Sequence, residues 1–93
     1  MFEATLKDIQ AKILQQHYVM TIHADEEMAD DELMLADIEQ TILTGKILEC
    51  QKDRVTAERK YKIQGCSIDG DRVEVIAKLG MSGKVVIITV YAL

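Results

Sequence analysis

The sequence predicts an α+β fold in which N-terminal helices pack on one face of a three- to four-stranded antiparallel sheet. In the first half of the chain, apolar residues recur every three or four positions, as they do in amphipathic helices. From residue 46 onward they alternate with polar residues, as they do in strands. A chain of 93 residues is long enough for one hydrophobic core, so we expect a single domain spanning residues 1–93.

Three helices are predicted in the first half, at residues 3–16, 24–31 and 34–44. Gly45 follows the third helix and is expected to be its C-cap. Between the first two helices, the β-prone run at residues 17–22 is either a brief strand or an extended link. The predicted apolar stripes of the first and third helices comprise Leu6, Ile9, Ile13, Leu14, Leu35, Ile38, Ile42 and Leu43.

Four strands are predicted in the second half, at residues 46–50, 57–64, 72–79 and 84–91. An Asp-Gly turn separates the second strand from the third, and a glycine-containing turn precedes the fourth. The last strand is apolar on both faces, which is typical of a strand that is covered on both sides or lies centrally in a sheet. The residues expected to be almost fully buried are Ile38, Ile42, Val75, Ile88 and Val90.

Charge is distributed unevenly along the chain, whose net charge is −5. Residues 22–39 hold eight carboxylates and no lysine or arginine, whereas residues 46–93 hold nine basic residues against six acids. If the two halves fold as separate layers, one face repels phosphate and the other can accept it. The N-terminus lacks a secretory pattern and no apolar run is long enough to span a membrane, so we expect a cytoplasmic protein.

The acidic stretch contains His23, Glu27 and Asp31 at intervals of four residues, which would place them near one face of a helix. This spacing is admissible for a metal site but not specific, because no second histidine and no calcium-loop pattern accompanies it. We therefore predict carboxylates along solvated helix faces, with no metal or other cofactor. Cys50 and Cys66 stand alone, without the spacing of a zinc or redox motif.

A basic stretch with an aromatic residue, "RKYK" at residues 59–62, is the other candidate for function. On a strand, Lys60 and Lys62 share one face and could present cations to an RNA backbone, while Tyr61 lies on the other. The alternative is cross-strand ion pairing, for instance with Glu74, while Tyr61 packs in the core. The residues alone leave both interpretations open.

Several local patterns, taken in order, point to a known family. They are "HA" at residues 23–24 with Met28 four residues after the His–Ala pair, "ADIEQTILTGKILE" with its glycine at the helix end, Gly65 before a turn, and the closing "VVIITVY". In these features the chain resembles the domain of unknown function 4258 family of small bacterial proteins. That family is similar to the ribonuclease-toxin superfamily that includes the RelE, ParE and BrnT toxins, and the resemblance runs from about His17 to Tyr91.

The resemblance implies a RelE/ParE-like fold and a metal-independent endoribonuclease that pairs with a small antitoxin encoded nearby. Family members usually carry arginines at the positions of Glu27 and Asp31, and often a histidine at that of Glu74. Acids at these positions remove donors that would stabilise a phosphorane, and they reverse the local field.

Two functional hypotheses follow. In the first, the chain is a toxin-like ribonuclease that acts on RNA through His23, Arg59, Lys60, Tyr61 and Lys62, with the imidazole as general acid or base. In the second, it is a non-catalytic module that binds a partner protein through its acidic helix face. His23 is equally explained as a cap at the start of a helix.

Overall fold

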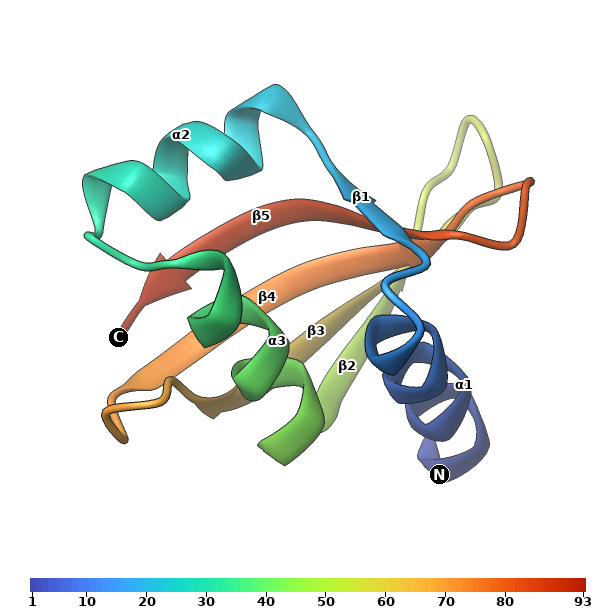
Figure 1. Cartoon of the computed structure of the whole chain (residues 1–93). Coiled ribbons are helices and arrows are strands. Elements are labelled where there is room, and N and C mark those ends of the chain that lie inside the picture. The colour runs from blue at the N-terminus through green and yellow to red at the C-terminus, as the bar shows by residue number, and fades with distance from the viewer.

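The computed structural model describes residues 1–93 and consists of three helices and one five-stranded sheet (Figure 1). The predicted α+β class is confirmed, and each predicted helix and strand overlaps an observed one. In chain order the elements are α1 (Glu3–Leu14), β1 (Tyr18–Met20), α2 (Ile22–Asp30), α3 (Leu35–Thr44), β2 (Lys46–Lys52), β3 (Arg59–Cys66), β4 (Arg72–Leu79) and β5 (Val85–Ala92).

The sheet is mixed, with strand order β1-β5-β4-β3-β2. Strands β2 to β5 form the predicted antiparallel meander, and β1 adds a fifth strand that runs parallel to β5, with Tyr18 opposite Val85. The prediction of a wholly antiparallel sheet with three or four strands is therefore wrong. Strand β1 has only three residues, which is too few to show alternation, and its partner β5 lies far away in the sequence, so its pairing could not be predicted. Strand β5 is flanked by β1 and β4, as its apolar faces indicated.

Helices α1 and α3 cover one face of the sheet, and α2 packs along β5 (Figure 1). No helix covers the opposite face, which we call the open face. Helix α3 lies very close to β3 because two glycines meet at the contact. A Cβ atom on Gly65 would lie only 2.0 Å from the Thr41 carbonyl oxygen, and one on Gly45 would lie 2.6 Å from the same atom. Gly45 is the C-cap of α3, as predicted, with an extended backbone.

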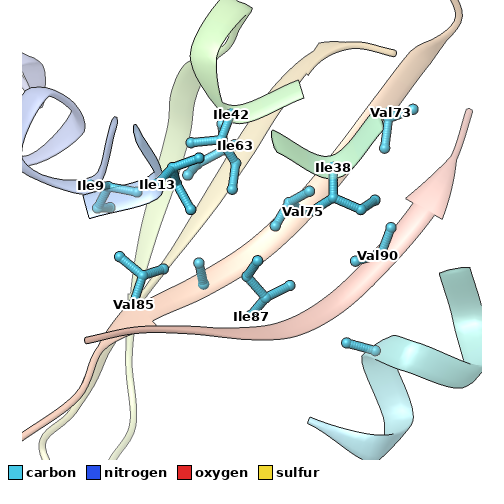
Figure 2. Close-up of a cluster of buried hydrophobic side chains, with 12 residues drawn as sticks. Ile9, Ile13, Ile38, Ile42, Ile63, Val73, Val75, Val85, Ile87 and Val90 are labelled. Atoms are coloured by element: carbon cyan, nitrogen blue, oxygen red, sulfur yellow. The ribbon is translucent and has the colours of Figure 1, made fainter. Parts of the chain in front are cut away.

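The core lies between the helices and the sheet, with most of its helical residues on α1 and α3 and one, Ala24, on α2 (Figure 2). Ile38, Ile42, Val75 and Val90 are fully buried, as predicted. Ile88 is only partly buried, because a bulge interrupts the pairing of β4 with β5: the register passes from Ile76–Thr89 to Ala77–Ile87. The twelve core residues are Ile9, Ile13, Ala24, Ile38, Ile42, Ile63, Val73, Val75, Ala77, Val85, Ile87 and Val90.

Two of the predicted apolar-stripe residues lie largely outside the core. Leu14, at the end of α1, is 71% exposed, and Leu35, at the start of α3, is 46% exposed. Both lie at helix ends, Leu14 as the last residue of α1 and Leu35 as the first of α3. No helix of the chain has the length and the apolar character required to cross a membrane.

Candidate functional site

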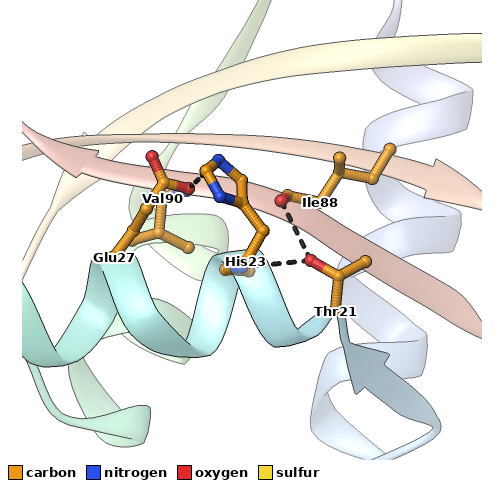
Figure 3. A network of polar contacts seen from close by, with 6 residues as sticks. Thr21, His23, Glu27, Ile88 and Val90 are labelled. Carbon is orange, nitrogen blue, oxygen red and sulfur yellow. Dashed lines mark hydrogen bonds and ion pairs between the residues drawn. The ribbon is translucent and has the colours of Figure 1, made fainter.

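His23 lies in the first turn of α2 and points toward the next turn of the same helix (Figure 3). Its side chain is 66% exposed, and its Nε2 atom is 3.2 Å from Oε1 of Glu27. The helix cap is Thr21, whose hydroxyl oxygen accepts a hydrogen bond from the Ala24 N–H at 3.0 Å. The same hydroxyl donates to the Ile88 carbonyl at 3.1 Å and so ties the start of α2 to β5. The capping interpretation of His23 is therefore wrong.

Glu27 and Asp31 accept hydrogen bonds from the backbone of β5. The Val90 N–H donates to Glu27 Oε1 at 3.2 Å, and the Ala92 N–H donates to Asp31 Oδ2 at 2.8 Å. Four residues along a helix advance about 6 Å and two residues along a strand about 6.6 Å, so the two spacings match. The acidic pair thus covers the edge of β5 beyond the point where β1 ends.

This arrangement corrects, for Glu27 and Asp31, the expectation that the carboxylates of residues 25–39 lie on solvated helix faces; Asp25, Glu26 and Asp30 are exposed, as expected. The Glu27 side chain is only 25% exposed, and both Glu27 and Asp31 hold the sheet edge. An arginine at either position could not accept a hydrogen bond from a backbone N–H, because a guanidinium group has only donors. In this chain the two acids have a structural role, and no group of three or more His, Cys, Asp or Glu side chains is arranged to bind a metal ion.

The basic stretch lies on β3, which β4 and β5 separate from α2. Tyr61 shares the helix-covered face with Ile63, packs against the core, and makes an edge-on contact with Phe2, with ring centroids 6.4 Å apart. Lys60 and Lys62 lie on the open face. Arg59 is exposed where β3 begins. The structure therefore brings Lys60 and Lys62 together, places Tyr61 on the opposite face, and leaves His23 beyond the two intervening strands.

Lys62 is engaged in a cross-strand ion pair. Its Nζ atom is 3.2 Å from Oε1 of Glu49, the residue opposite it on β2. The hydrogen bond to Glu49 raises the pKa of Lys62, so its ammonium group is charged at neutral pH. The sequence interpretation of cross-strand pairing is thus confirmed for Lys62, although the partner is Glu49 rather than Glu74.

Glu74 is at the centre of the open face and is only 8% exposed. Its neighbours Val73 and Val75 point into the core, so its own side chain points to the other side of the sheet. Gln64 and Tyr91 are its register partners on β3 and β5. The Gln64 amide donates to Glu74 Oε2 at 3.0 Å, and the Tyr91 hydroxyl donates to Glu74 Oε1.

The hydrogen bond to Glu74 raises the pKa of Tyr91, so the phenol keeps its proton at neutral pH. The open face thus combines a buried carboxylate, a protonated phenol and, on the neighbouring strand, the ammonium of Lys62. Gln64 and Tyr91 were not recognised from the sequence as site residues. In the sequence each of them alternates with a core residue, which indicates that its side chain lies on the other face of the sheet. Only the strand register shows that both side chains meet Glu74.

Comparison with known proteins identifies the family of the chain. A family model described as "Domain of unknown function (DUF4258)" matches residues 20–92. No curated protein and no solved structure matches the chain. The matched segment covers the last residue of β1, all of α2 and α3, and the whole meander, including Lys62, Gln64, Glu74 and Tyr91. The chain belongs to the DUF4258 family.

Proposed function

We propose that the chain is a toxin-like protein that binds single-stranded RNA on the open face of its sheet. The observation that carries the proposal is the Glu74–Tyr91 hydrogen-bonded pair, which lies at the centre of this face within two strands of Lys62. Buried, partnered titratable groups at an uncovered surface are typical of sites that perform chemistry.

RNA binding is supported by the cations of the same face. Lys60 and Lys62 on β3 and Lys78 on β4 alternate with core-facing residues and so point away from the helices. Lysine ammonium groups can neutralise phosphates, and a tyrosine ring can stack on an unpaired base. The acids of residues 22–39 lie in and around α2 and α3, away from this face. On the face itself Lys62 is paired with Glu49 and Lys78 with Glu58, so a phosphate would have to displace these carboxylates, whereas Lys60 forms no ion pair.

The same groups suffice for cleavage without a metal ion. Glu74 would accept the proton of a ribose 2′-OH as its oxygen forms a bond to phosphorus, and Tyr91 would donate a proton to the departing 5′ oxygen. The products are a 2′,3′-cyclic phosphate and a free 5′-hydroxyl group. A proton then returns from Glu74 to Tyr91 along their hydrogen bond, which resets the pair. Lys62 would stabilise the negative charge of the phosphorane.

His23, Arg59 and Tyr61 have no part in this proposal. His23 contacts Glu27 on α2, and Tyr61 lies on the helix-covered face. Of the residues selected from the sequence, Lys60 and Lys62 remain as RNA-binding candidates. They are joined by Gln64, Glu74 and Tyr91, whose arrangement depends on the strand register.

RNA binding is tested with Lys62→Gln and with Lys7→Gln as a matched control. Lys7 is an exposed lysine of α1 that forms no ion pair. Fluorescence anisotropy on a mixed-sequence single-stranded RNA should show weaker binding by Lys62→Gln and a log–log salt slope reduced by about 0.7, the value for one phosphate contact. Equal affinities of the two variants would contradict the proposal.

Cleavage is tested with Tyr91→Phe and Glu74→Gln, in buffer containing a chelator. Either change should lower the cleavage rate by about a hundredfold or more if the pair transfers protons, while Tyr91→Phe should bind RNA nearly as well as the unmodified protein. If the unmodified protein binds RNA but does not cleave it, the catalytic part of the proposal fails and the binding part stands.

A further inference from the structure

A groove of about 480 Å³ is lined by residues of β1, α2 and α3. Its volume is within the range of sites that hold a few side chains of a ligand. The apolar lining comes from Tyr18, Val19, Met20, Met28 and Leu35, and the acidic groups of the lining are Asp25 and Glu39. The groove thus combines an apolar floor with carboxylates at its rim.

The apolar lining is incompletely covered by the chain itself. Val19 is 43% exposed and Leu35 is 46% exposed. Close by in the sequence, Ile22 is 80% exposed and Met34 is 71% exposed. Apolar side chains that line a groove and remain exposed, as Val19 and Leu35 do, are characteristic of a surface that binds another protein.

The charged residues that line the groove, Asp25 and Glu39, are both acidic. No lysine or arginine occurs between Lys12 and Lys46, although the chain carries eight carboxylates within residues 22–39. Glu27 and Asp31 are hydrogen-bonded to β5, and Glu39 accepts a hydrogen bond of 2.6 Å from the Tyr18 hydroxyl.

The other acids of α2 are free to meet a partner. Asp25, Glu26 and Asp30 are exposed and form no salt bridge. The rim would therefore repel an acidic segment and attract a basic one.

We propose that this groove binds a segment of a second protein in which an aliphatic or aromatic residue is flanked by lysine or arginine. The apolar residue would enter between Met28 and Leu35, and its basic neighbours would lie against Asp25 and the exposed acids of α2. The segment would approach from the helix side, so the open face would stay accessible. This inference does not depend on the proposed RNA site.

The test is selection of peptides from a random phage-displayed library on the full chain. The groove variant combines Leu35→Ser with Asp25→Lys. The matched control combines Leu48→Ser with Asp69→Lys, which removes an equally exposed leucine on β2 and reverses one charge in the turn after β3. Both variants change the net charge by the same amount, and thermal melts establish that each is folded.

Selected peptides should carry an apolar residue flanked by lysine or arginine. Synthetic copies should bind the unmodified chain and the control with similar affinity, and should bind the groove variant about tenfold more weakly, with an affinity that falls as salt rises. Absence of enriched peptides, or equal binding by the two variants, would overturn the inference.

Two other outcomes would replace the proposed occupant. Enrichment of purely apolar peptides with salt-independent binding would contradict a basic partner. A dimer of the unmodified chain that dissociates only in the groove variant would identify a second copy of the chain as the occupant. The groove variant and the control should bind RNA with equal affinity. A failure of the groove proposal can therefore be distinguished from a failure of the RNA proposal.

Discussion

Replacing Glu27 with alanine should lower the free energy of unfolding by about 2 kcal/mol, since hydrogen bonds to charged groups contribute about 1.5–3 kcal/mol. The change leaves the Val90 N–H without its acceptor. Val90 is fully buried, so water cannot readily replace the carboxylate. The corresponding change at Asp31 should cost less, because Asp31 and Ala92 are exposed and water can hydrate the freed N–H.

Urea denaturation of the two variants measures these losses, and Glu26→Ala is the matched control. Glu26 lies on the same helix, is exposed and makes no side-chain hydrogen bond or salt bridge, so its removal should change stability by less than about 0.5 kcal/mol. For a chain of this size, the Glu27 variant should also melt about 8–16 °C lower, since 1 kcal/mol corresponds to about 4–8 °C.

Hydrogen exchange locates the effect. Relative to the unmodified chain, Glu27→Ala should accelerate the exchange of the Val90 amide, and it should do so by a larger factor than for amides in the middle of β3. Glu27→Arg should destabilise the chain more than Glu27→Ala, because it places the guanidinium donors of arginine against the Val90 N–H donor. If Glu27→Ala is no more destabilising than Glu26→Ala, the carboxylate does not hold the edge of β5 and the structural explanation for its acidity is refuted.

Three further predictions concern packing and titration. Gly65→Ala should cost about 3 kcal/mol in a denaturant melt, because its Cβ would lie 2.0 Å from a backbone oxygen of α3; a loss below about 1 kcal/mol would contradict the close contact. Ile38→Ala should cost about 2–5 kcal/mol and Leu14→Ala less than about 0.5 kcal/mol, so equal losses would refute the assigned core. Burial, and then the hydrogen bond to Glu39, raise the pKa of Tyr18, so its contribution to stability is complete below the unfolded pKa near 10 and is lost as the pH rises further. Tyrosinate absorbance should show this residue ionising last, and Tyr18→Phe should remove part of the alkaline loss of stability.

Local patterns were sufficient to predict most of the elements. The meander is made of neighbouring strands joined by short turns, so alternation and glycine positions locate it directly. Strand β1 could not be resolved in this way, because its pairing with β5 joins residues far apart in the chain. The bulge at Ile88 could not be predicted from the sequence either. Strict alternation places Ile88 on the same face as Val90, whereas the bulge in the pairing with β4 changes the face on which Ile88 lies.

The candidate site shows the same division. Lys60 and Lys62 were identified from composition and correctly assigned to one face of a strand. The partners of Glu74 depend on the register of three strands, which no local pattern specifies. Glu27 and Asp31 were interpreted as acids that replace arginines, whereas their contacts with β5 require the three-dimensional position of α2.

The most direct test of the RNA proposal is an amide chemical-shift titration of the isotope-labelled chain with a short single-stranded RNA. The proposal predicts that the largest shifts fall on Lys62, Glu74 and Tyr91 and their strand neighbours, while the amides of α2 stay unchanged. Shifts confined to the helices, or no shifts at RNA concentrations well above that of the protein, would contradict an RNA site on the open face.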